Sequence, residues 1–168
     1  MKGDWKVITE NEQKVYDVMD QLGISYKRYE HPPVYTVEEA QQYWKDIDGA
    51  HAKNLFLRNN KGNRHFLVVL EQSKSADLKD LSGKLAAGKL SFASERRLQE
   101  HLGLETGAVS PFGIINDQDK KVTLVIDKTM QKKESVNFHP NVNTATINVS
   151  YQDFEKFLKH CGNAIIYI

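Results

Sequence analysis

A lysine and an asparagine stand side by side where an apolar strand is expected to begin. Lys53 and Asn54 directly precede the run LFLR. At the mouth of such a strand, a cation and an amide can point into a cleft while Leu55 and Leu57 anchor the backbone. Lys53 is there suited to grip a phosphate or a polarised carbonyl. The alternative is a solvated lysine at a strand end, which residue types alone do not exclude.

A second candidate group combines small side chains with a rigid proline. Gly107, Ala108, Val109 and Ser110 directly precede Pro111. Small residues expose main-chain N–H groups, and such groups held by a rigid turn form a cradle for a developing oxyanion or a carboxylate. An ordinary connection between a helix and a strand is the alternative.

A histidine beside a proline is the third candidate. His139 lies in the run NFHPN, after an expected strand, and Pro140 restricts the approach of its ring to the sheet. The ring is placed to orient a substrate or a water molecule. A structural histidine in a turn is the alternative.

The sequence predicts neither a metal site nor a cofactor. The six histidines are scattered, and the single Cys161 cannot supply a thiolate cluster. The run GKLAAGKL at 83–90 has the spacing of a phosphate-binding loop up to Lys89. Leu90 then stands where that loop needs a magnesium-binding serine or threonine, so we reject nucleotide binding there.

Composition predicts one ordinary globular domain spanning residues 1–168. The chain is 40% hydrophobic and 27% charged, as ordinary globular domains are. Its formal net charge is only +1, so the net charge does not indicate a nucleic acid partner. A single cysteine fits a reducing compartment, and we expect a cytoplasmic protein. The sequence holds no run of 18 apolar residues, so no contact with a membrane is expected.

Hydrophobic periodicity and capping residues predict a mixed α/β domain that positions these candidates. Strands at 53–58 and 64–70, joined by the turn-rich NNKGN, should form the centre of a sheet. We expect the segment TGAVSPFGIIND to be a loop. The other expected elements are helices at 10–22, from Thr36, after Ser75, from Ser94 to Gly103 and from Ser150, and strands at 24–31, 122–128, 134–138, 144–149 and in AIIYI.

Three separated motifs resemble one known family. They are HPPVYTVEEA at 31–40, AKN at 52–54 and LSFASERRLQEHLGLETGAVSPFGIIND at 90–117. In this order they are similar to the free-standing aminoacyl-tRNA deacylases related to the inserted editing domain of bacterial prolyl-tRNA synthetase, the YbaK family. Within that family the chain most resembles the alanine-specific branch of prolyl-tRNA synthetase associated proteins.

The resemblance implies a fold and a set of roles. The fold is an α/β domain with a curved, largely antiparallel sheet wrapped by helices, which agrees with the elements above. The family's essential lysine matches Lys53, and its neighbouring asparagine matches Asn54. Its Gly-to-Pro loop falls on 107–111 and its helper histidine on His139.

The resemblance also implies an activity, the hydrolysis of alanine mischarged onto the tRNA for proline. A synthetase pocket built for proline cannot strongly reject a smaller apolar amino acid, because each missing methylene is worth only about 1–3 kcal/mol. A small editing pocket would admit the alanyl methyl and exclude the proline ring. Val34, Tyr35 and Thr36 are the expected pocket wall, and Pro111 is a further expected substrate contact.

The mechanism we expect uses water as the nucleophile, without an acyl-enzyme or a metal. The N–H groups of 107–110 would hold the ester carbonyl as its oxygen becomes negative. Lys53 would fix the terminal adenosine phosphate or the ester region, while Asn54 and His139 position the ribose. The free 2′-hydroxyl of the substrate would assist the water, so that no Ser–His–Asp set is needed.

Other functions stay open from sequence. The same fold would serve as a binding module that holds aminoacyl-tRNA or a synthetase without chemistry, or as a deacylase for cysteine, serine or threonine. A small-ester hydrolase unconnected to tRNA is a further alternative. The expected partners are mischarged tRNA for proline and, as a second candidate, prolyl-tRNA synthetase. The C-terminal helix and the AIIYI tail leave both a monomer and a homodimer open.

Overall fold

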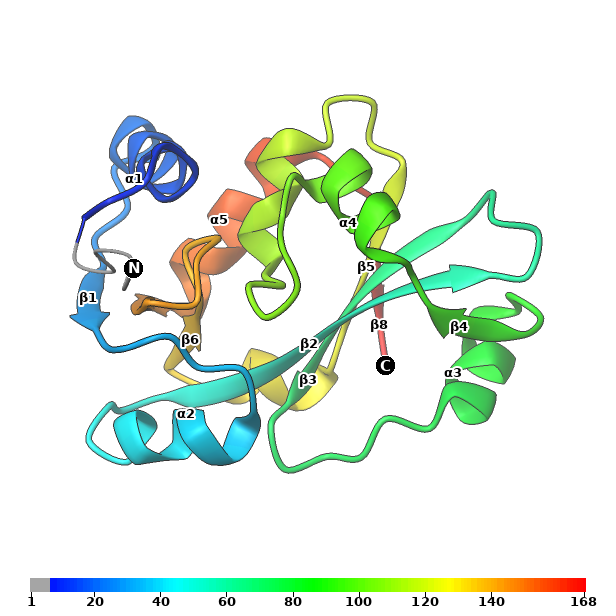
Figure 1. Cartoon of the computed structure of the whole chain (residues 1–168), viewed down its shortest axis with the longest axis horizontal. Coiled ribbons are helices and arrows are strands. Elements are labelled where there is room, and N and C mark those ends of the chain that lie inside the picture. Colours follow the sequence, from blue (N-terminus) through cyan, green and yellow to red (C-terminus); the bar gives the residue numbers. More distant parts are fainter. Residues whose placement is uncertain (1–6) are drawn as a thin grey trace, which may run out of the picture.

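The computed structural model describes residues 7–168 and contains an open eight-stranded sheet with helices against it (Figure 1). The strand order is β1-β7-β6-β2-β3-β5-β8, with β4 pairing β2 beside this path. Four strand pairs are antiparallel and three are parallel. The strands are β1 (Lys27–Glu30), β2 (Ala50–Asn59), β3 (His65–Glu71), β4 (Leu90–Phe92), β5 (Val122–Ile126), β6 (Ser135–Phe138), β7 (Ala145–Ser150) and β8 (Ile165–Tyr167). The predicted mixed α/β fold with a mostly antiparallel sheet is confirmed.

The hairpin of β2 and β3 lies at the centre of the sheet, as predicted. Its turn is held by the side chain of Asn59, whose Oδ1 accepts hydrogen bonds from the main-chain N–H groups of Asn63 and Arg64. Gly62 supplies the positive φ of 73° that this turn requires. Beyond the hairpin, β2 pairs with β6 only at Ala50 and His51, and with β4 only from Leu57 onward.

Most helices begin at the residues that the sequence marks for this. The side chains of Thr9, Thr36, Ser94 and Ser150 each accept a hydrogen bond from the first turn that follows, which satisfies a main-chain donor that no helix partner reaches. Asp77 does the same for the helix predicted after Ser75. The helices are α1 (Glu10–Leu22), α2 (Val37–Trp44), α3 (Leu78–Leu85), α4 (Glu95–Leu102) and α5 (Tyr151–Cys161).

Apolar side chains project from both faces of the central hairpin, and helices pack against each face and bury them. Phe56 and Leu67 belong to one buried cluster, together with residues of α1, α4 and α5. Leu57 and Phe66 belong to the other, under α3. Each buried side chain of this size contributes about 1.5–3 kcal/mol, so the hairpin is the rigid base on which the loops are placed.

Some elements differ from the sequence prediction. Strand β2 begins at Ala50, three residues before the expected start, because Ala50 and His51 pair with the distant β6. The segment expected to be a loop contains the 3₁₀ helix η1 (Pro111–Asn116), and the short strand β4 and the 3₁₀ helix η2 (Lys128–Lys132) lacked a sequence signal. Across residues 7–168, none of the helices has the length and apolar character needed to cross a membrane.

Candidate active site

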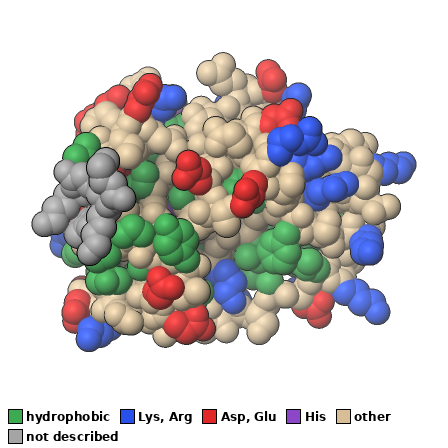
Figure 2. All heavy atoms as spheres, viewed as in Figure 1, with side chains coloured by type: hydrophobic (Ala, Val, Ile, Leu, Met, Phe, Trp, Pro, Cys, Tyr) green, Lys and Arg blue, Asp and Glu red, His purple; other side chains and the backbone are tan. Residues whose placement is uncertain are grey.

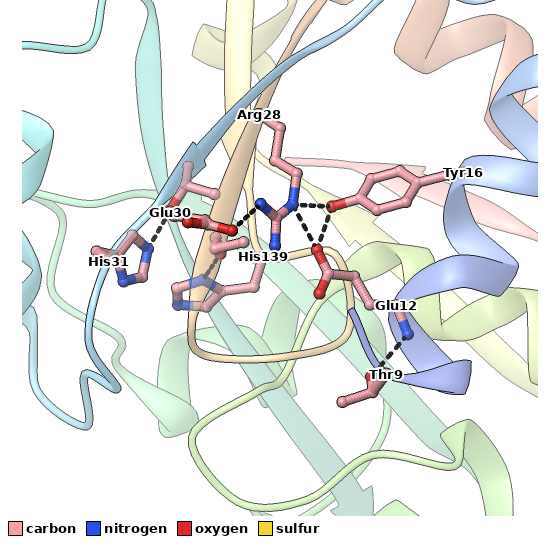
Figure 3. Close-up of polar contacts among 9 residues, drawn as sticks. Thr9, Glu12, Tyr16, Arg28, Glu30, His31 and His139 are labelled. Atoms are coloured by element: carbon pink, nitrogen blue, oxygen red, sulfur yellow. Dashed lines mark hydrogen bonds and ion pairs between the residues drawn. The ribbon is translucent and has the colours of Figure 1, made fainter. Parts of the chain in front are cut away.

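Two histidine rings lie together where β1 and β6 end (Figure 3). The centroids of His31 and His139 are 5.9 Å apart. Nδ1 of His139 lies 2.9 Å from the carbonyl oxygen of Ala145, and Nδ1 of His31 lies 3.0 Å from that of Pro32. Because a carbonyl oxygen only accepts, each ring carries a proton on Nδ1.

The Nε2 atoms of the two histidines differ in what they meet. Nε2 of His31 lies 3.0 Å from the hydroxyl of Thr146, which donates to it in this tautomer. Nε2 of His139 has no hydrogen-bond partner among residues 7–168. Burial, and then the neighbouring His31, lower the pKa of His139 to about 4, although its bond to the carbonyl of Ala145 opposes the shift. At neutral pH, His139 therefore offers an unprotonated nitrogen with a free lone pair.

The loop that begins at Gly107 lies against Tyr35. Gly107 has a φ of 90°, and a Cβ added there would lie 3.1 Å from Cδ1 of Tyr35. The loop also approaches Asn143, which forms hydrogen bonds with both the N–H and the carbonyl of Val34. Val34 N donates to Asn143 O at 3.3 Å, and Asn143 Nδ2 donates to Val34 O at 3.1 Å. Glycine is therefore required where these two loops meet.

The N–H groups of the predicted cradle are not equivalent. The N–H of Ala108 already donates to the carbonyl of Glu105 at 3.1 Å. Those of Gly107, Val109 and Ser110 have no acceptor within residues 7–168. Because Ser110 has no exposed surface, two donors, those of Gly107 and Val109, remain for a ligand where the sequence suggests four.

Two residues of this loop have structural partners of their own. The side chain of Ser110 is fully buried and accepts a hydrogen bond from Phe112 N at 3.2 Å, so it caps η1. Pro111 is buried as the first residue of η1. Pro111 thus fixes the loop from behind, and its burial leaves little surface for the predicted substrate contact.

The predicted pocket wall is also divided. Val34 is only 3% exposed, and the hydroxyl of Thr36 accepts from Glu39 N at 3.1 Å as the cap of α2. Tyr35 is 68% exposed. Tyr35 and Thr36 are thus exposed, whereas Val34 is not, and the hydroxyl of Thr36 is already used as the cap of α2.

Lys53 and Asn54 leave β2 on opposite faces, as neighbours in a strand must. Lys53 pairs with Leu70, which belongs to the cluster under α3, and Asn54 pairs with Val69, which belongs to the cluster on the other face. Lys53 Nζ donates to the carbonyl of Lys74 at 2.8 Å. Asn54 Oδ1 is buried without a partner. Within residues 7–168, no hydrogen bond joins either residue to the histidine pair or to loop 107–110.

A buried ion pair holds β1, the strand that leads into His31 (Figure 3). Arg28 Nε lies 2.8 Å from Oε2 of Glu12, a residue with no exposed surface. The hydroxyl of Tyr16 donates to the same carboxylate, and Arg28 Nη1 reaches Glu30 at 2.7 Å. The pair therefore ties α1 to β1 and fixes the direction in which the chain enters the site.

Sequence reasoning missed His31, Asn143 and the ion pair. The only sequence signal for His31 is that it opens the run HPPVY after an expected strand. Its contact with His139 depends on the pairing of β1 with β7, which no local pattern shows. Within residues 7–168, His, Cys, Asp and Glu side chains form no group of three suited to a metal ion.

Comparisons with known proteins place this geometry in context. A model of the aminoacyl-tRNA editing domain matches residues 31–157. The chain is 48% identical over 153 residues to the "Prolyl-tRNA editing protein ProX" of Acetoanaerobium sticklandii, covering 90% of this chain and 92% of that protein. It is 36% identical to the "Prolyl-tRNA synthetase associated domain-containing protein 1" of Bos taurus, covering 84% and 85%.

More distant similarities agree with these. The "Multifunctional Ser/Thr-tRNA deacylase ProXp-y" of Escherichia coli K12 is 27% identical, covering 68% of each chain. The crystal structure of a candidate trans-editing enzyme for prolyl tRNA synthetase superposes with a TM-score of 0.71 at 18% identity, covering 96% of this chain and 98% of that one. At that identity, the superposition supports the fold.

Proposed function

The chain belongs to the aminoacyl-tRNA editing domain family and is an aminoacyl-tRNA deacylase, and from this premise we propose that it removes alanine mischarged onto the tRNA for proline. The relative named ProX supports prolyl-tRNA editing, at 48% identity over nearly the whole of both chains. The observation that carries the proposal is the loop at Gly107, where main-chain donors without acceptors lie next to an exposed tyrosine.

The loop supplies stabilisation of the transition state. When water attacks the ester carbonyl, its oxygen becomes negative, and the N–H groups of Gly107 and Val109 are the donors available to hold it. A single such donor contributes about 3–4 kcal/mol in enzymes where it has been removed. Because the turn and η1 fix these donors before the reaction, no reorganisation is needed as the charge develops.

His139 supplies an acceptor in the neutral state. Its Nε2 lone pair accepts from a ribose hydroxyl or from the attacking water and so orients it, while Nδ1 stays bound to Ala145. The free 2′-hydroxyl of the substrate assists the water, and Asn54 helps to hold the ribose. Since the pKa of His139 is about 4, this acceptor is present throughout the neutral range.

Lys53 binds the anionic end of the substrate in this proposal. Its Nζ is held by the neutral carbonyl of Lys74, near the surface. Exchange of that bond for one to the terminal phosphate or the ester region gives a charge-assisted hydrogen bond, which is roughly twice as strong. Lys74 itself is committed elsewhere, because its Nζ pairs with Asp127 at 2.7 Å.

Selection between amino acids falls to Tyr35. Its ring lies against Gly107, and in this proposal it limits the space beside the ester so that a methyl group enters and a proline ring is excluded. We also propose prolyl-tRNA synthetase as a protein partner, because a relative is named as associated with it. A homodimer stays a prediction.

The test is release of labelled alanine from alanyl-tRNA for proline by the purified chain, with prolyl-tRNA as the control substrate. We expect alanine alone to be released, and Lys53→Ala to slow its release by at least about 100-fold, as for loss of one strong charged contact to the anionic end of the substrate. Lys159→Ala, a change of an exposed lysine on α5, is the control and should leave the rate unchanged. Release of proline, serine or threonine in place of alanine would overturn the proposed specificity.

A further inference from the structure

The carbonyl that holds Lys53 belongs to a turn at the end of β3. Lys53 pairs with Leu70 near that end, and its Nζ donates to the main-chain carbonyl of Lys74 at 2.8 Å. The turn is closed by a hydrogen bond from Lys74 N to the carbonyl of Glu71 at 3.0 Å. Residues 72–74 lie outside the helices and strands. The position of the Lys74 carbonyl therefore depends on what fixes this turn.

The side chain of Asp127 fixes the turn at both of its ends. Asp127 follows β5, the parallel neighbour of β3, so the carboxyl ends of the two strands meet at this edge of the sheet. Its Oδ2 accepts from Glu71 N at 3.0 Å, and its Oδ1 accepts from Lys74 Nζ at 2.7 Å. Thr129 N donates to the same Oδ1 at 2.9 Å. One carboxylate thus joins the start and the end of the turn to η2.

Burial and charge make this anchor hard to release. Asp127 is 1% exposed, whereas the side chain of its partner Lys74 is 44% exposed. Burial raises the pKa of Asp127, but the hydrogen bonds from Lys74, Glu71 N and Thr129 outweigh it and lower the pKa to about 2. At neutral pH the buried group is a carboxylate. If Lys74 left it, a buried charge would stay without its cation, which is strongly unfavourable.

We propose that Asp127 is a positioning residue for the deacylation: through the side chain of Lys74 it fixes the carbonyl that holds Lys53. A free lysine side chain loses much rotamer freedom when it binds a ligand. Because the carbonyl of Lys74 keeps the amine in one place, part of that ordering is complete before the substrate arrives. The inference rests on the role proposed above for Lys53 and does not depend on alanine.

The first test measures the amine of Lys53 in the protein without tRNA. Trace labelling with acetic anhydride, followed by mass spectrometry of the peptide that contains Lys53, reports how firmly the amine is held. Asp127→Asn leaves one acceptor oxygen where there were two and places an NH₂ group among donors. We expect Lys53 to be labelled about tenfold faster, as for loss of a hydrogen bond to a charged group. Unchanged labelling would overturn the proposal.

A second variant reaches the same contact without touching the buried carboxylate. Lys74→Met removes the ammonium but keeps the aliphatic stem and the main-chain carbonyl, and its site is exposed enough for the protein to fold. We expect the same faster labelling of Lys53. Asp80→Asn is the control, because it breaks the exposed ion pair of Asp80 with Lys84 on α3 and should leave the labelling of Lys53 unchanged. Labelling that rises equally in the control would contradict the route through Lys74.

The rate of alanine release separates positioning from a purely structural role. We expect Asp127→Asn to lower kcat/KM about tenfold in the otherwise unchanged protein and to have no further effect when Lys53 is already alanine. A residue that only stabilises the fold lowers the rate by the same factor in both backgrounds. Equal factors, or a faster rate in the Asp127 variant, would overturn the proposal.

The two proposals fail in different ways. Alanine release by the unchanged protein, with labelling of Lys53 that does not respond to either variant, would overturn the role of Asp127 and leave the proposed function standing. Labelling that responds, in a protein that releases no alanine, would do the reverse.

Discussion

At the scale of single residues, the position most sensitive to change is Gly107. A side chain there is strained twice, by the positive φ of 90° and by contact with Tyr35 at 3.1 Å. We expect Gly107→Ala to destabilise the protein by about 1–3 kcal/mol and to slow alanine release more than tenfold, because the displaced loop misplaces its donors.

Gly83→Ala is the control for that change. Gly83 lies in α3, and a Cβ added there meets no atom within 4 Å. We expect an unchanged or slightly raised stability, since alanine favours helix over glycine by about 1 kcal/mol. Thermal unfolding and single-turnover hydrolysis, measured on both variants, check the pair. Equal effects would mean that the loop tolerates a side chain.

Residue types identified the candidates from sequence, but not their partners. The sequence predicts that Lys53 and Asn54 point into one cleft, yet strand geometry sends them to opposite faces. The sequence also predicts that the N–H of Ala108 is free to hold a ligand, although the carbonyl of Glu105 accepts from it. Both differences depend on where the strand begins and on how the turn closes. The start of β2 is set by its pairing with the distant β6, whereas the turn from Glu105 to Ala108 is local but lacks a sequence signal.

At the scale of elements, the ion pair between α1 and β1 should respond to loss of either charge. Arg28→Met leaves the carboxylate of Glu12 buried without its partner, and we expect a loss of about 3–5 kcal/mol of unfolding free energy. Urea unfolding measures it. The matched control is Glu30→Gln, which breaks the other ion pair of Arg28 at the surface and should cost less than about 1 kcal/mol. A small loss in both variants would show that β1 is held by its pairing with β7 alone.

Helices were easier to predict than strands. A cap such as Thr9 or Ser150 and the apolar spacing after it are contained within one stretch of sequence. Strand β4 exists because Leu57 pairs with Phe92, and η1 exists because Ser110 caps it. Three-residue strands and 3₁₀ turns are too short to show a hydrophobic period in the sequence, so they are recognised only from the structure.

At the scale of the whole molecule, buried neutral histidines make stability depend on pH. The pKa of His65 is lowered to about 4 by burial, and then by His101 and nearby arginines, and that of His31 is lowered by burial. Between about pH 4 and 6.5 the unfolded chain binds protons that the folded chain does not, so the free energy of unfolding falls as pH falls. For His65 alone we expect a loss on the order of 1–2 kcal/mol between pH 7 and pH 5.

Unfolding in urea at several pH values tests this. His65→Gln should flatten the decline, because glutamine still accepts from Arg97 but does not titrate. His160→Gln, at an exposed position of α5, should leave the slope as it is. A decline that both variants share equally would place its origin in other groups.

The charge distribution, unlike the net charge, suits a polyanion. Lys and Arg side chains gather over α3, α4 and the β2–β3 turn on one part of the surface (Figure 2). Arg58 and Arg97 both approach Gly62 in that turn. We expect tRNA binding to weaken as salt rises, and Lys61→Ala and Arg64→Ala each to lower the slope of log Kd against log salt by about one. Lys128→Ala, in η2, is the control, and a slope near zero for the unchanged protein would exclude phosphate contacts.

The pairing of β1 with β7 also sets when the site comes into being during synthesis. Lys27 pairs with Asn148, 121 positions later, and the loop that carries His139 lies just before that strand. A nascent chain that has already exposed Lys53 and Gly107 still lacks the pairing that brings His31 to His139. Translation must therefore deliver β7 before the two histidines meet, and we expect the enzyme to be inactive until that strand has been synthesised.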